Sequence, residues 1–138
     1  MSADLDTILS DFEFLDDWED RYRYVIDLGR QMPDFPEDAR TEANKVRGCA
    51  SQVWLLAENK DGTLHFSGDS DAMIVSGLIA ILIATYSGKT PEAIMATDIE
   101  SIFTKLGLKE HLTQQRSNGF ASMVQRIRAD AGGTLATT

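Results

Sequence analysis

The chain has 138 residues, 43% of them hydrophobic, which fits one domain built around one core. Its formal net charge of −9 argues against nucleic-acid binding, which rewards the neutralisation of phosphates by Lys and Arg. The longest apolar stretch, residues 73–86, is too short to span a bilayer, so we expect no membrane segment. The acidic start of the chain does not resemble a secretory leader.

Two helices are expected in the N-terminal part of the chain. Ser2 is expected to cap the first, which carries apolar residues at helical spacing as far as Phe12. Asp17 is expected to cap the second, which should end near Gly29. Prolines in residues 33–36 then interrupt regular structure.

The periodicity of the sequence changes after Cys49. Residues 52–58 are rich in strand formers, an Asp-Gly turn follows, and residues 63–68 alternate between apolar and polar side chains. This pattern predicts an antiparallel hairpin that pairs 52–58 with 63–68. Because two strands alone are marginally stable, a helical cover or a third strand is required, and residues 46–48 or a segment after the turn are candidates for that strand.

A helix is predicted over residues 72–87, with Asp69 or Ser70 as its cap. Its apolar side chains cover nearly the whole circumference, which is typical of a helix at the centre of a fold. Helices before a hairpin and more helices after it indicate an α+β fold, in which helices pack against a small antiparallel sheet.

Three more helices are expected in the C-terminal part of the chain. Thr90 and Asp98 are expected to cap two short ones. The last should cover residues 117–131 and end at the Gly-Gly pair that follows. We therefore expect a single domain over residues 1–138, in which residues 132–138 form a frayed tail.

Cys49 is the only cysteine, which excludes an intrachain disulfide and thiolate-rich metal or cluster sites. A free thiol without an export signal indicates a reducing compartment, and we expect a cytoplasmic protein. Most lone cysteines are small buried hydrophobes. This one lies between Gly48 and the start of a strand, and Lys45 and Arg47 are close enough in sequence to favour its thiolate. These residues alone support a reactive role and a structural role about equally.

A cysteine-dependent enzyme would need a base, and His65 and His111 are the two candidates. A surface imidazole is the simpler interpretation of each, since no oxyanion-hole motif and no glycine-rich phosphate loop accompanies them. Arg116, expected just before the last helix, is either a solvated arginine or a cation near the thiol or a partner. Asp71, expected one turn into the central helix, interacts with the helix dipole or with a partner.

Motifs spread over most of the chain resemble one known family. The segment around the cysteine is VRGCASQVW (residues 46–54). The others, in order, are DWEDRY (17–22), IDLG (26–29), GDSDA (68–72), VSGL (75–78), LGL (106–108), HLT (111–113) and RSNG (116–119). Together they resemble the SufE/CsdE family of sulfur acceptors over about residues 5–131. Ala50 stands where that family often has glutamine, and we expect this change to alter loop contacts but not the sulfur chemistry.

The resemblance implies an accessory protein that is not itself an enzyme. A pyridoxal-phosphate cysteine desulfurase of the SufS or CsdA type would place a persulfide sulfur on Cys49. The acceptor would stimulate that enzyme and relay the sulfur to a SufBCD-type Fe–S scaffold. The chain itself would need no cofactor and no metal. Its fold would be the SufE/IscU-like sandwich, and we expect a monomer or a weak homodimer.

The resemblance also implies roles for individual residues. Arg47, Asp71 and Arg116 become candidates for partner binding. Because an exposed thiolate is open to over-oxidation, we expect Cys49 to be shielded in the free protein and to swing out when a partner docks. A third hypothesis is a binding module that regulates a partner without sulfur transfer.

Overall fold

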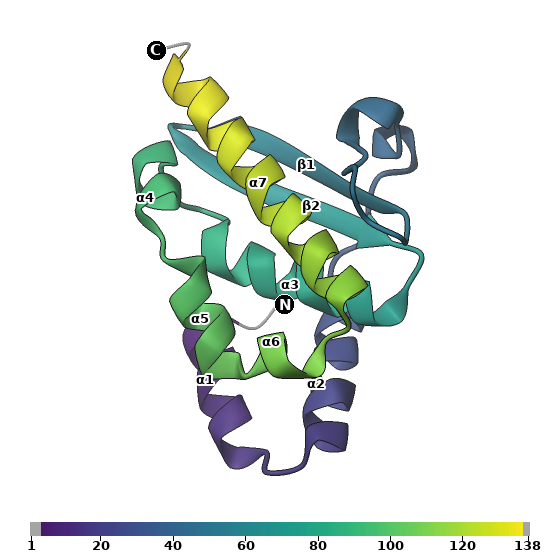
Figure 1. Ribbon diagram of the computed structural model, residues 1–138. Helices are drawn as coiled ribbons and strands as arrows, with labels where there is room; N and C mark the ends of the chain where they lie inside the picture. Colours follow the sequence, from purple (N-terminus) through teal and green to yellow (C-terminus); the bar gives the residue numbers. More distant parts are fainter. Residues whose placement is uncertain (1–3, 137–138) are drawn as a thin grey trace.

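The computed structural model describes residues 4–136 and confirms the predicted α+β fold (Figure 1). The helices are α1 (Leu5–Phe14), α2 (Trp18–Arg30), α3 (Met73–Tyr86), α4 (Pro91–Ala96), α5 (Ile99–Leu106), α6 (Leu108–His111) and α7 (Gln114–Ala136), and the strands are β1 (Val53–Lys60) and β2 (Thr63–Ser70). Helix α3 packs against α2 and β2, while α7 contacts α4 and β1. Figure 1 shows α7 as the long helix that crosses the hairpin in this view.

The predicted hairpin is present and is longer than the sequence indicates. Its strands pair antiparallel from Val53 opposite Ser70 to Lys60 opposite Thr63. Asp61 closes the turn in the left-handed region, with φ 54°, which is a conformation that Asp tolerates better than most residues. Within residues 4–136 the sheet has two strands, so the third strand proposed at 46–48 is wrong. Single bridges, Lys45 to Trp54 and Leu64 to Lys89, extend the hairpin instead.

One face of the hairpin supplies part of the core. Val53 and Leu55 of β1 and Leu64 and Phe66 of β2 alternate inward and are buried. The other half of this core comes from α3, where buried residues cover most of the circumference, as its sequence predicts. The helical cover that two strands require is therefore α3.

The start of α3 differs from the prediction. Ala72 occupies the N-cap position and no side chain caps the helix. The Oγ of Ser70 accepts a hydrogen bond from the Ala72 N–H at 3.2 Å, which lies before the first turn. The side chain of Asp69 is already paired with Arg40. Asp71 consequently precedes α3 and does not lie within it.

Two glycines allow α2 and α3 to cross at close range. A Cβ on Gly77 would lie 2.1 Å from the backbone oxygen of Val25, and one on Gly29 would lie 2.7 Å from the Gly77 nitrogen. No real Cβ tolerates such distances, so only glycine permits this crossing. The crossing attaches the two N-terminal helices to the central helix.

Capping residues define most of the other helix starts. Asp17, Thr90 and Asp98 cap α2, α4 and α5, as predicted. In α1 the cap is Asp4, whose carboxylate accepts a hydrogen bond from the Thr7 N–H at 2.8 Å. The predicted cap, Ser2, lies outside the described residues.

The last helix is longer than predicted at both ends. It begins at Gln114 because the hydroxyl of Thr113 accepts a hydrogen bond from the Arg116 N–H at 3.2 Å. It continues to Ala136 through Gly132 and Gly133, so the prediction that the helix ends there and a tail begins at residue 132 is wrong. A helix tolerates glycine at a cost of about 1 kcal/mol each, and Ala131 remains fully buried beside them. The short helix α6 was not predicted.

Candidate functional site

Cys49 lies in a loop, residues 46–52, that leads into β1. The Val46 N–H donates to the Val53 oxygen at 2.8 Å and closes the base of this loop. Gly48 has φ 89°, a conformation that other residues rarely adopt. A Cβ on Gly48 would also lie 2.6 Å from the Oγ of Ser122, so glycine lets the loop lie against α7.

The thiol of Cys49 faces the start of α7. Its Sγ donates to the carbonyl oxygen of Gly119 at 3.5 Å, and the residue is half-buried. Gly119 leaves space at this point, since a Cβ there would lie 3.5 Å from Sγ. The sulfur is thus shielded, in the way the over-oxidation argument predicts, by a loop that rests on a helix.

The expected effect of the neighbouring cations is wrong. Burial raises the pKa of the Cys49 thiol above its ordinary value, because a buried thiolate loses its hydration. The Arg47 side chain is 86% exposed and lies 3.9 Å from Glu42. Together with Lys45 it lines a different depression, and neither cation lines the thiol pocket. Closeness in sequence therefore does not bring these cations to the sulfur, and the closed loop favours the protonated thiol.

A pocket of about 230 Å³ opens beside the thiol. The loop, the first turns of α3 and the start of α7 enclose it, and its lining includes Cys49, Val75, Leu78, Arg116, Gly119 and Met123. Arg116 is the charged side chain of this set, and it lies in the first turn of α7, not before the helix as expected. An apolar wall beside one cation is suited to a polarisable sulfur atom that carries a partial negative charge.

Asp71 holds the far end of the loop. Its carboxylate accepts a hydrogen bond from the Gln52 N–H at 3.0 Å, and its own N–H donates to the Gln52 oxygen at 3.3 Å. This pair of bonds ties the residue before β1 to the connection between β2 and α3. Asp71 is exposed, so its carboxylate is also accessible to a partner.

The two histidines are not part of this site. On β2, the Nε2 of His65 lies 3.0 Å from the Oγ1 of Thr63. The ring of His111 meets Trp18 edge to face, with centroids 4.0 Å apart. Both histidines belong to the described residues, and neither lines the pocket of Cys49. The geometry therefore gives no support to a cysteine–histidine pair.

The described part of the chain holds no group of three or more His, Cys, Asp or Glu side chains placed to ligate a metal ion. None of the helices in that part is both long enough and apolar enough to cross a bilayer.

The sequence anticipated some residues of the site and missed others. Cys49 and Arg116 share the pocket, and Asp71 lies at the end of the loop. Gly119 was part of a quoted motif, but its contact with the sulfur was not predicted. Met123 was expected to face the interior, which it does as part of the pocket wall.

The chain has relatives among known proteins. The model of the SufE family, described as an Fe-S metabolism associated domain, matches residues 6–131. An uncharacterized SufE-like protein of Rhizobium etli is 57% identical over 133 residues, which cover 94% of this chain and 90% of that protein. Another, of Rhizobium meliloti, is 54% identical over 135 residues, covering 95% and 96%.

A solved structure supports the fold. The solution structure of a hypothetical protein from Thermus thermophilus matches with a TM-score of 0.77 and covers 96% of each chain, at 22% sequence identity. The fold and the sequence relatives together define an accessory protein of Fe–S metabolism. The chain belongs to the SufE family.

Proposed function

We propose that this protein is a sulfur acceptor that takes a persulfide sulfur onto Cys49 from a cysteine desulfurase of the SufS or CsdA type. It stimulates that enzyme by removing its product, and it relays the sulfur to a SufBCD-type scaffold for Fe–S cluster assembly. The observation that carries this proposal is a lone thiol, held by a loop in a small pocket beside Arg116, in a chain of the SufE family.

The transfer is a nucleophilic attack of sulfur on sulfur. The Cys49 thiolate attacks the outer sulfur of the donor's persulfide, and a new S–S bond forms between Sγ and that sulfur. The donor's own S–S bond breaks, and its electron pair leaves on the donor's cysteine sulfur as a thiolate. The number of S–S bonds is unchanged, so no external oxidant or reductant takes part. Relay to the scaffold repeats this attack, with Cys49 as the leaving thiolate.

The closed loop explains how the thiol is kept until a partner arrives. Burial raises the pKa of Cys49, so the resting protein presents little thiolate to oxidants. When a partner draws the loop outward, the thiol regains its hydration and its pKa falls toward the ordinary value. The thiol of Cys49 then becomes deprotonated and accessible at the same time, when the persulfide of the desulfurase is close enough to be attacked.

Three residues are proposed as partner contacts. Arg116 lines the pocket, where its guanidinium stabilises the negative charge on the transferred sulfur. Arg47 is exposed on the loop itself, and Asp71 is exposed at its end. The net charge of −9 suits a partner with a basic docking surface.

The remaining expectations complete the proposal. The pyridoxal phosphate belongs to the desulfurase, and the acceptor carries sulfur on its own thiol without a cofactor. A free thiol that has to stay unoxidised between transfers is preserved in a reducing compartment, so we propose that the protein is cytoplasmic. We propose that it acts as a monomer or a weak homodimer.

Mass spectrometry of the protein after incubation with a desulfurase and cysteine tests the proposal. We expect Cys49 to gain one sulfur atom, and the Cys49→Ser variant to gain none and to leave the desulfurase unstimulated. Stimulation that survives Cys49→Ser would instead indicate a binding module that regulates the enzyme without carrying sulfur. Absence of the added sulfur on wild-type Cys49 would refute the proposal.

A further inference from the structure

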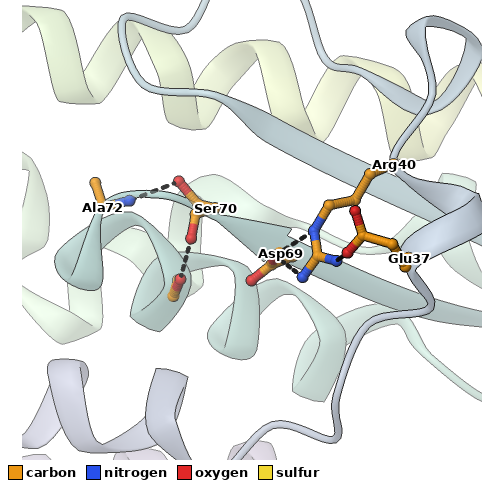
Figure 2. A network of polar contacts seen from close by, with 6 residues as sticks. Glu37, Arg40, Asp69, Ser70 and Ala72 are labelled. Atoms are coloured by element: carbon orange, nitrogen blue, oxygen red, sulfur yellow. Dashed lines mark hydrogen bonds and ion pairs between the residues drawn. The ribbon is translucent and has the colours of Figure 1, made fainter.

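Arg40 precedes the Cys49 loop and joins it to the end of β2. It lies between two short 3-10 turns, Glu37–Ala39 and Glu42–Asn44. Its Nε and Nη2 both donate to the Oδ2 of Asp69, at 3.0 and 2.7 Å, and its Nη1 pairs with Glu37 (Figure 2). One guanidinium thus links the segment before the loop to the last residues of β2.

The Arg40–Asp69 ion pair is partly buried. The side chains of Arg40 and Asp69 are each 29% exposed. The guanidinium also lies over two aromatic rings, 5.7 Å from the centroid of Phe35 and 6.0 Å from that of Trp54. Exposed ion pairs contribute little to stability. A partly buried pair with two donors, whose guanidinium also lies within cation–π distance of two aromatic rings, fixes its partners in one geometry.

The partners of Arg40 surround the base of the loop. Trp54 lies opposite Asp69 in the hairpin register, and it also forms the bridge with Lys45. Residue 45 enters the loop and residue 54 follows it, so Arg40 contacts the point where the two ends of the loop meet. Asp69 is two residues before Asp71, whose carboxylate holds Gln52. The Val46–Val53 and Asp71–Gln52 hydrogen bonds therefore lie within two residues of a group that Arg40 contacts. Arg126 of α7 also holds the start of the loop, by donating to the oxygens of Ala43 and Lys45.

We propose that Arg40 is a positioning residue that keeps Cys49 retracted, by fixing through Asp69 and Trp54 the base of the loop that carries the thiol. Arg40 does not line the pocket of Cys49, so it acts on the sulfur only through the loop. A role of Arg40 in sulfur transfer rests on the proposed function. Its role in keeping the Cys49 loop closed does not. If Arg40 only stabilises the fold, its replacement should lower the free energy of unfolding and leave the reactivity of the Cys49 thiol unchanged.

Alkylation of Cys49 by iodoacetamide, followed from neutral to alkaline pH, separates these alternatives. In Arg40→Gln we expect the alkylation rate in native buffer to rise about five- to thirtyfold, since a loss of one or two kcal/mol shifts the population of the open loop by that factor. We also expect the midpoint of the pH–rate profile to move down, because an open loop hydrates the thiolate. Arg40→Lys keeps the charge but not the two fixed donors to Asp69, so it should give an intermediate rate.

Arg21 offers a matched control. Its guanidinium also donates twice, to the oxygens of Leu15 and Phe12, and lies over Phe12 and Trp18, but it holds the corner between α1 and α2. Arg21→Gln should lower the free energy of unfolding and leave both the alkylation rate and its pH midpoint unchanged. Urea unfolding of all variants reports how much stability each has lost.

Two results would overturn the proposal. One is an alkylation rate and midpoint in Arg40→Gln equal to those of the wild type. The other is an equal rise in Arg21→Gln, which would attribute the effect to general instability. If Arg40→Gln does not fold, Asp69→Asn removes the same ion pair with little change of shape and is read by the same criteria. The alkylation assay needs no desulfurase, so it tests the role of Arg40 even if wild-type Cys49 never gains sulfur. That second outcome would count against the proposed function alone.

Discussion

The Sγ of Cys49 lies 3.5 Å from the carbonyl oxygen of Gly119, so the thiol-bearing loop rests directly on the first turns of α7. A side chain on residue 119 would project toward the sulfur, where a Cβ would lie 3.5 Å from Sγ and 3.8 Å from the Cβ of Cys49. Those distances are ordinary van der Waals contacts. Residue 119 therefore sets how closely the loop can approach the helix.

A size series at Gly119 tests this relationship. Gly119→Ala should fold, keep Cys49 retracted, and gain up to about 1 kcal/mol from the helix propensity of alanine. Gly119→Val adds methyl groups beyond a Cβ that already touches the sulfur, so it should push the loop away and raise the rate of Cys49 alkylation severalfold. Alkylation and urea unfolding measure the two effects. An equal alkylation rate in all three proteins would show that the loop does not depend on this contact.

The raised pKa of Cys49 predicts a pH dependence of stability. The folded protein holds this proton more tightly than the unfolded chain does, because burial disfavours the thiolate. The stabilisation is therefore fully present below the ordinary cysteine pKa of 9.0 and is lost as pH rises through the higher folded-state value. Urea unfolding at neutral and alkaline pH should show a steeper loss for the wild type than for Cys49→Ala. Parallel curves for the two proteins would contradict this prediction.

The parts of the fold that the sequence predicts are those set by local chemistry. Asp17, Thr90 and Asp98 cap the helices they precede, because a cap needs only its own side chain and the next turn of backbone. The Asp-Gly turn fixes the hairpin for the same reason. The place of the cysteine in a loop between a glycine and a strand also follows from nearby residues.

The errors concern contacts between residues far apart in the sequence. Arg47 is two residues from Cys49, but its side chain is exposed, lies near Glu42 and does not line the thiol pocket. The pKa of the thiol is raised by burial and is not lowered as the neighbouring cations led us to expect. Arg40 and Asp69 are 29 residues apart, and no local pattern connects them. Asp69 or Ser70 was expected to cap α3, but the helix begins after Ala72 and the carboxylate of Asp69 pairs with Arg40 instead.

The two arginines near the loop should differ in their effect on sulfur transfer. Arg116 lines the pocket, whereas Arg47 is exposed, is not part of the pocket lining and lies near Glu42. Arg116→Ala should slow the formation of the Cys49 persulfide about ten- to a hundredfold, since a hydrogen bond to a charged group contributes roughly 1.5–3 kcal/mol. Arg47→Ala should weaken docking of the desulfurase more than the chemical step, and its effect should diminish at high salt. The rate of single-turnover sulfur transfer at saturating desulfurase reports the chemical step without docking. An equal loss of that rate in Arg116→Ala and Arg47→Ala would contradict the prediction.

Asp71 should act as a latch on the end of the loop. Asp71→Ala removes the acceptor for the Gln52 N–H, a bond worth about 1 kcal/mol at an exposed site, and should open the loop about fivefold more often. Asp71→Asn retains a side-chain oxygen and should lie between the wild type and alanine. The rate of hydrogen exchange at the Gln52 amide reports directly how often its hydrogen bond to Asp71 opens. Unchanged exchange in Asp71→Ala would show that this bond does not hold the loop.

The crossing of α2 and α3 should be the point of the fold least tolerant of added volume. Gly77→Ala places a Cβ 2.1 Å from the backbone oxygen of Val25, and a backbone atom cannot move aside without shifting its whole helix. We expect a loss of about 3 kcal/mol or more in the free energy of unfolding. Gly132→Ala is the control, because a Cβ there meets nothing within 4 Å and a helical alanine should add about 1 kcal/mol. Urea unfolding of both variants measures these opposite changes in the free energy of unfolding. A Gly77→Ala protein as stable as the wild type would mean that the helices do not cross this closely.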